Sequence, residues 1–160
     1  MGHSGFEINS DGRKILIDPF IEGNSNSPTE IDEIKDVDIV CVTHDHKDHF
    51  GDAIELCENN NATFVGIFEL SEYVNSQGTE STIGLNIGGT AEVKGIDISL
   101  VKAFHSAQRG SPSGFVLSTS ETTIYHAGDT DVFGDMKLIR DLYHPKIACL
   151  PIGGYYTMDP

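Results

Sequence analysis

The side chains best suited to chemistry in this sequence stand together in one short segment, His44-Asp45-His46-Lys47-Asp48-His49. Imidazole nitrogens and carboxylate oxygens are ligands that suit zinc, iron or manganese. His44 and His46, two residues apart in an extended turn, can both reach one ion, whereas the adjacent Asp48 and His49 can reach a second ion. Two ions roughly 3.5–4 Å apart can hold a bridging hydroxide at neutral pH. The alternative, a solvated polar loop, is disfavoured because so many ligand-type residues directly follow an apolar run.

Two further candidate ligands also stand just after predicted strands. Strands predicted over 100–104 and 122–126 are followed by His105 and Asp129, as the strand predicted over 38–43 is followed by the histidine-rich segment. Functional loops are commonly held at strand ends by a rigid sheet, so these side chains are expected to meet there. Taken singly, each could equally be an ordinary polar residue at the end of a strand.

The elements that must position these residues follow from hydrophobic periodicity and turn residues. The run Ser-Pro-Thr-Glu at 27–30 is typical of a helix start, and the segment 79–90 receives no assignment. The pattern predicts an α/β (α+β layered) domain, with sheets packed together and helices outside. Strands are expected over 5–9, 14–18, 38–43, 63–67, 114–119, 122–126 and, buried, 147–152; a hairpin within 91–104; and helices over 53–57, 69–77 and 135–143.

Composition excludes several classes of function. The net charge of −15 and the sequence pI near 4.6 disfavour binding to nucleic acid and to anionic lipid. No apolar stretch approaches the roughly 20 residues that span a bilayer, and the start of the chain shows no secretory signal. The three cysteines are too few and too widely spaced for a disulfide framework, so a reducing cytoplasm is the expected location.

The motifs, in their order along the chain, resemble those of the metallo-β-lactamase superfamily. HxHxDH at 44–49 is preceded by an aspartate that ends an early strand, Asp18, and followed by a lone histidine, His105, and a Gly-Asp pair at 128–129. Other segments are similar to the metal-dependent hydrolase branch related to ascorbate-6-phosphate lactonase. These segments are Gly2–Phe6, Leu16–Phe20, Asn86–Thr90, Tyr125–Thr130 and Leu150–Gly154. The resemblance implies a metallo-β-lactamase-like αββα sandwich.

The resemblance also implies a role for each matching residue. Asp18 would accept the free N–H of a liganding histidine and fix its tautomer. His3 would contact substrate or the developing oxyanion near the cleft. Six side chains would ligate two divalent cations: His44, His46 and His105 at the first, Asp48 and His49 at the second, and Asp129 between both.

The activity implied by the resemblance is that of a metal-dependent hydrolase. A metal-bound hydroxide would attack a small ester, lactone or phosphoester, and Asp48 would orient this nucleophile and take its proton. Zinc is expected from the ligand types, with manganese or iron as alternatives. The expected partner is a small-molecule substrate, with no nucleic acid and no membrane; a nuclease of the same superfamily is disfavoured by the negative charge.

Other charged residues near these motifs have two interpretations each. Lys47, Lys102 and Arg109 could attract a small anionic substrate or could be ordinary solvated surface residues. His126 could face either the core or the cleft. His144, at the end of a predicted helix, is interpreted as a partner of the helix dipole.

Members of the family begin a few residues earlier and continue further, with a helix, a strand and another histidine for the second metal. The resemblance therefore implies one domain over 1–160 that lacks the family's C-terminal helix and strand region. An exposed sheet edge would favour association into a homo-oligomer. The alternative function that follows is a truncated, non-catalytic metal-binding or assembly protein of the same fold.

Overall fold

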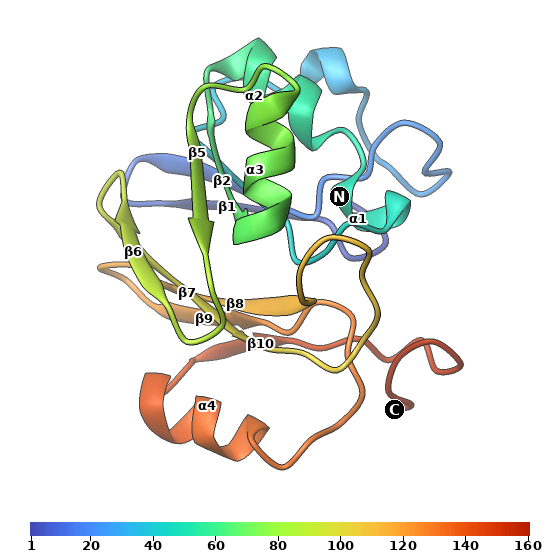
Figure 1. Cartoon of the computed structure of the whole chain (residues 1–160), viewed down its shortest axis with the longest axis vertical. Helices are drawn as coiled ribbons and strands as arrows, with labels where there is room; N and C mark the ends of the chain where they lie inside the picture. The colour runs from blue at the N-terminus through green and yellow to red at the C-terminus, as the bar shows by residue number, and fades with distance from the viewer.

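Two β-sheets pack face to face, with α2 and α3 outside the first sheet and α4 outside the second (Figure 1). The computed structural model describes every residue from 1 to 160. This arrangement confirms the predicted layered α/β fold. No helix is both long enough and apolar enough to cross a membrane. The elements are β1 (Phe6–Ser10), β2 (Arg13–Ile17), a 3-10 helix (Ile31–Glu33), β3 (Ile39–Cys41), α1 (Lys47–Phe50), α2 (Ala53–Asn60), β4 (Thr63–Ile67), α3 (Phe68–Ser76), β5 (Thr82–Leu85), β6 (Thr90–Val93), β7 (Ile96–Lys102), β8 (Ser113–Ser118), β9 (Thr123–His126), α4 (Met136–Tyr143) and β10 (Ile147–Cys149).

The first sheet has the strand order β1-β2-β3-β4-β5. Strands β1 and β2 form an antiparallel hairpin around Asp11-Gly12, as the Asp-Gly pair predicts. The strands from β2 to β5 are all parallel. The apolar side chains of β3 and β4 are buried on both faces, as is typical of parallel strands covered on both sides. Because β2 and β3 run in the same direction, the residues that follow them emerge at one edge of the sheet.

The second sheet has the strand order β10-β9-β8-β7-β6 and is antiparallel except for the pair β9 and β10. Since β8 lies antiparallel between β7 and β9, these two strands also end at a common edge. Ser113, at the start of β8, joins the sheets at this point. Its N–H and its hydroxyl both donate to the carbonyl of Thr43, at 3.0 and 3.1 Å. The edges at which the four strands end are therefore held against each other.

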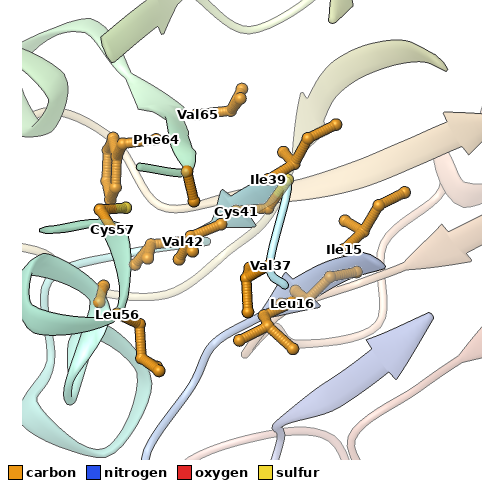
Figure 2. Close-up of a cluster of buried hydrophobic side chains, with 14 of the residues drawn as sticks. Ile15, Leu16, Val37, Ile39, Cys41, Val42, Leu56, Cys57, Phe64 and Val65 are labelled. Carbon is orange, nitrogen blue, oxygen red and sulfur yellow. The ribbon is translucent and has the colours of Figure 1, made fainter. Parts of the chain in front are cut away.

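The main hydrophobic core lies between the sheets and beneath α2 and α3. Figure 2 shows Ile15 and Ile39 from neighbouring strands in the same cluster as Phe64 of β4 and Leu56 and Cys57 of α2. That cluster contains 26 buried residues, whereas the cluster between the second sheet and α4 contains only five. Burial is therefore deepest around β2, β3 and β4, and two of these strands lead into the histidine-rich region.

The predicted helix start at 27–30 is wrong. The chain forms only the 3-10 helix Ile31–Glu33, whose start is capped by the Glu33 side chain, which accepts from the Glu30 N–H at 3.2 Å. The hydroxyl of Ser27 instead donates to the carbonyl of Thr29 at 2.8 Å. Ile34 already has an extended backbone (ψ 106°), and Asp36 has a left-handed one (φ 60°), so a longer helix does not form before β3.

Two expectations for strands also need correction. The unassigned segment 79–90 contains β5, a short edge strand that pairs with β4. The predicted buried strand over 147–152 ends at Cys149, and its residues are largely exposed. Only β9 pairs with β10, because β10 is the last strand at that edge of the sheet.

Asp38, just before β3, forms hydrogen bonds to β2 and to the turn between β6 and β7. Its carboxylate accepts hydrogen bonds from Arg13 Nη1 and the Lys14 N–H, both at 3.0 Å, and its carbonyl accepts one from Lys94 Nζ at 2.9 Å. Partial burial opposes ionisation of this carboxyl group. The hydrogen bonds and the nearby cations outweigh that effect and hold the pKa of Asp38 below its ordinary value.

We expect Asp38→Asn to lower the free energy of unfolding by about 1.5–3 kcal/mol near neutral pH, since hydrogen bonds to an ionised group are lost. Because the folded-state pKa is depressed, this contribution is present above the ordinary carboxyl pKa and is lost as the pH falls through the lower folded value. Urea unfolding near neutrality and in acid checks this, with Asp97→Asn, an exposed carboxylate on β7, as the control. Equal loss at both pH values would contradict it.

Candidate metal centre

Four strand ends converge on one group of imidazoles and carboxylates. Strand β2 leads into Asp18, β3 into the segment 44–49, β7 into His105 and β9 into Asp129. The carboxyl ends of parallel strands meet at one edge of a sheet, and here the edges of two sheets face each other. Gly128 has a positive φ of 63°, and a Cβ there would lie 2.7 Å from the carbonyl oxygen of Ser113. Only glycine fits this turn, which directs Asp129 into the group.

Three histidines from two loops form the first part of the group. The ligand atoms of His44, His46 and His105 all lie within 4.8 Å of one another. His44 Nε2 is 3.0 Å from His46 Nδ1, and the His105 ring centroid is about equally far from both other rings, at 5.0 and 5.1 Å. Residues 60 positions apart in the chain therefore point at one common region.

The second part of the group surrounds His49. His49 Nε2 lies 3.3 Å from Asp129 Oδ2 and 4.0 Å from Asp48 Oδ2. Asp129 Oδ2 is also 3.7 Å from His105 Nε2, so this carboxylate lies between the two sets of imidazoles. His44, His49 and Asp129 form a second triad of ligand atoms within 4.8 Å of one another.

Asp18 is completely buried and orders the histidines through a short chain of hydrogen bonds. Its carboxylate accepts from the Thr43 N–H (2.8 Å), the Thr43 hydroxyl (2.7 Å) and His49 Nδ1 (2.8 Å). Because the Thr43 hydroxyl proton goes to Asp18, its oxygen is left to accept from His44 Nδ1 at 3.0 Å. Both rings then present their Nε2 atoms to the group.

The charges inside the group depend on burial and on the neighbouring carboxylates. Burial, together with the nearby His49, lowers the pKa of His44 to about 3, so this imidazole is neutral. Burial also opposes protonation of His49, but the nearby carboxylates of Asp129 and Asp18 raise its pKa to about 10. For Asp18 and Asp129 the histidines outweigh burial, and the pKa of each carboxyl group lies below its ordinary value. The carboxylates are therefore ionised.

One buried atom tests whether these residues fit a metal ion. His49 Nε2 is completely buried and has no hydrogen-bond partner, although two carboxylates lie within 4.0 Å of it. An unpartnered buried polar atom is costly. A divalent cation in the place of the second proton of His49 would leave a neutral imidazole beside carboxylate oxygens, a donor set that such cations prefer. The residues present therefore fit a divalent cation.

A partly buried ion pair connects the loop of His105 to the histidine-rich segment. The Asp45 side chain is only 2% exposed; it accepts from the Gln108 N–H at 2.8 Å and from Arg109 Nη1 at 3.1 Å. The Arg109 guanidinium also lies 4.0 Å from the centre of the Tyr73 ring, a cation–π contact. Of the basic residues considered for substrate binding, Arg109 is thus engaged by Asp45, and Lys102 pairs with Asp135 at 2.5 Å.

His126 joins the N-terminal segment to the turn that carries Asp129. The ring is almost fully buried; its Nε2 lies 3.0 Å from the Ser4 carbonyl, and its Nδ1 accepts from the Gly128 N–H at 3.2 Å. Nδ1 can accept only if Nε2 carries the proton, so Nε2 donates to Ser4. His126 therefore faces both the core and the cleft, which the sequence left open.

A cleft of about 750 Å³ opens beside the group. Its polar wall carries His46, Asp48, His105 and Asp129, and its opposite wall is formed by the segment 149–157. No lysine or arginine lines it. A small organic molecule fits a cleft of this size next to the imidazoles and carboxylates.

The structure brings the predicted metal ligands into this one region, with His3 at its rim beside Asp48. It also adds residues that sequence reasoning missed. Thr43 and Asp45 are separated from their partners by 25 and more than 60 residues, and no local pattern marks them. His144 lies apart from the group, as the residue that ends α4.

The fold and this donor set define the class of protein. The model for the β-lactamase superfamily domain matches residues 13–160, and the chain belongs to that family. A UPF0173 metal-dependent hydrolase from Caldivirga maquilingensis is 49% identical over 162 residues, which cover 100% of this chain and 71% of the relative. Another from Methanopyrus kandleri is 47% identical over 169 residues, covering 100% of this chain and 73% of that protein.

A solved structure agrees with this assignment. A metallo hydrolase from the hyperthermophilic archaeon Ignicoccus hospitalis is 41% identical and superimposes with a TM-score of 0.90, covering 99% of this chain and 71% of that one. The chain is therefore a member of the metal-dependent hydrolases of the β-lactamase superfamily, and the predicted metallo-β-lactamase-like fold is confirmed.

We expect Asp18→Asn to weaken divalent cation binding about 10- to 100-fold, because His49 and Thr43 lose the acceptor that fixes their orientation. The free energy of unfolding should fall by about 2–3 kcal/mol. Asp36→Asn is a matched control, since Asp36 also has a left-handed backbone but is exposed. Competition with a chromogenic chelator and urea unfolding measure the two effects; an Asp18→Asn protein that matches the control in both would refute the role of Asp18.

We expect Asp45→Asn to loosen the loop of His105, because the amide cannot replace the charged pair with Arg109. Hydrogen exchange at the Gln108 amide should become roughly tenfold faster, which corresponds to a loss of about 1.4 kcal/mol in local stability. Asp135→Asn, which breaks the exposed pair with Lys102, should leave that amide unchanged. Unaltered exchange in Asp45→Asn would show that the ion pair does not hold the loop.

Proposed function

We propose that this chain hydrolyses a small ester, lactone or phosphoester with the help of two adjacent divalent cations. The observation that carries the proposal is the arrangement of imidazole and carboxylate ligand atoms in three overlapping triads, two of which include the buried, unpartnered His49 Nε2. The family of metal-dependent hydrolases supports the reaction class. The open cleft beside these residues supports a small substrate.

The donor atoms divide into two sites in this proposal. His44, His46 and His105 would hold the first cation, because their nitrogens form a triad of imidazoles. Asp48 and His49 would hold the second, and Asp129, which faces both His49 and His105, would contribute to each. Ligands of nitrogen and carboxylate oxygen favour zinc, with manganese or iron as alternatives.

When bound, such cations act as Lewis acids and lower the pKa of a water molecule to near neutrality. The protein's own residues prepare the site for this chemistry. Asp18 and the Thr43 hydroxyl hold the His49 and His44 rings with Nε2 toward the cleft. Asp48 faces the cleft with its side chain 48% exposed, so it can orient the attacking water and accept its proton.

We also propose a cytoplasmic location and a small-molecule partner in place of nucleic acid. Three free cysteines, two of them buried in the core, support a reducing compartment. The charge of −15 supports the exclusion of polyanions. Exposed edge strands support association into a homo-oligomer, which sedimentation would measure.

Zinc- or manganese-loaded protein should hydrolyse at least one member of a panel of lactones, thioesters and phosphoesters. His46→Ala should abolish this rate, because a first-site nitrogen is lost, whereas His144→Asn should leave it unchanged. The measurement is the initial rate of each protein on each substrate, at matched cation occupancy. No rate above that of His46→Ala on any substrate would reject the proposed function.

A further inference from the structure

The N-terminal residues form a tight turn. The Gly5 N–H donates to the Gly2 carbonyl at 3.0 Å, and His3 between them has a left-handed backbone, with φ 54°. Gly2 also has a positive φ, and a Cβ there would lie 2.8 Å from the carbonyl oxygen of Asn26. The turn thus packs closely against the loop that contains Asn26.

The turn presents the imidazole of His3 to the segment 44–49. Figure 1 shows the N-terminus beside α1, the short helix that carries Asp48 and His49. His3 Nε2 lies 3.0 Å from Asp48 Oδ2, and its ring meets that of His49 edge to face with 5.3 Å between centroids. The hydrogen bond from His126 to the Ser4 carbonyl holds the turn in this place.

The three donor atoms are spaced as ligands of one cation would be. Atoms bound at about 2.0–2.2 Å to the same zinc ion lie roughly 3.0–3.5 Å from one another. His3 Nε2 is 3.0 Å from Asp48 Oδ2, and that oxygen is 4.0 Å from His49 Nε2, so small rotations bring all three into range. His3, Asp48 and His49 form a triad of ligand atoms within 4.8 Å of one another.

A simple ion pair between His3 and Asp48 accounts for only two of these atoms. The third, His49 Nε2, is completely buried, has no hydrogen-bond partner and faces the same point. A cation bound there satisfies all three atoms together, because it takes the place of the proton between His3 and Asp48 and gives His49 Nε2 a partner.

We infer that His3 is a ligand of the second cation, which rests on the proposed two-cation function and extends it. The resemblance assigns this residue to contact with the substrate, whereas its spacing here assigns it to the cation. The second site then takes its donors from three separate parts of the chain: His3 from the N-terminal turn, Asp48 and His49 from α1, and Asp129 from the end of β9.

The test is the number and affinity of bound cations in His3→Asn, measured with Zn²⁺ by equilibrium dialysis against a chelator buffer. Wild-type protein should hold two ions, and His3→Asn should hold one tightly and the other at least about tenfold more weakly. The matched control is His144→Asn, which replaces an exposed histidine with a similar backbone (φ 49°) outside the site. Asparagine tolerates this conformation, so both variants should remain folded.

A spectroscopic variant makes the assignment independent of affinity. In Co²⁺-loaded His3→Cys, a thiolate at position 3 would enter the coordination sphere and add a sulfur-to-cobalt charge-transfer band. Wild-type protein and His144→Cys should lack the band, which also controls for the native Cys149 in the cleft. Two ions of unchanged affinity in His3→Asn, with no band in His3→Cys, would overturn the inference. Wild-type protein that binds no stoichiometric cation would overturn the proposed function with it.

Discussion

The site depends on one buried carboxylate, that of Asp18. A charge with no exposure to solvent is tolerated only if its oxygens are well hydrogen-bonded, and Asp18 accepts bonds from Thr43 and His49. These same bonds decide which nitrogen of His49 carries a proton, and through the Thr43 hydroxyl they decide it for His44 as well. One carboxylate at the end of β2 thereby sets the orientation of two imidazoles that follow β3.

The layered fold explains why this arrangement can be rigid. Parallel strands deliver Asp18 and the histidine-rich segment to one edge, and β7 and β9 deliver His105 and Asp129 to the edge that faces it. The bonds from Ser113 to the Thr43 carbonyl join the sheets there. The Asp45–Arg109 pair and His126 connect the loops that carry donors from distant parts of the chain.

Much of this could be predicted from the sequence because the informative signals are local. The spacing within 44–49 and the apolar runs before His105 and Asp129 indicate ligands at strand ends, and the alternation of strands and helices indicates a layered fold. The Asp45–Arg109 pair joins residues 64 positions apart, which no local pattern can reveal. The helix expected from 27–30 failed because Ile34 already has an extended backbone. The burial of 147–152 depends on which elements pack against this segment, and only the complete fold defines them.

The position of the first cation is the most direct test of the whole account. Crystals of the zinc-loaded protein, measured at the zinc absorption edge, would locate the metal by anomalous scattering. The account predicts a peak about 2.0–2.1 Å from nitrogens of His44, His46 and His105. A peak elsewhere on the surface, or none between these three rings in protein shown to contain zinc, would contradict it.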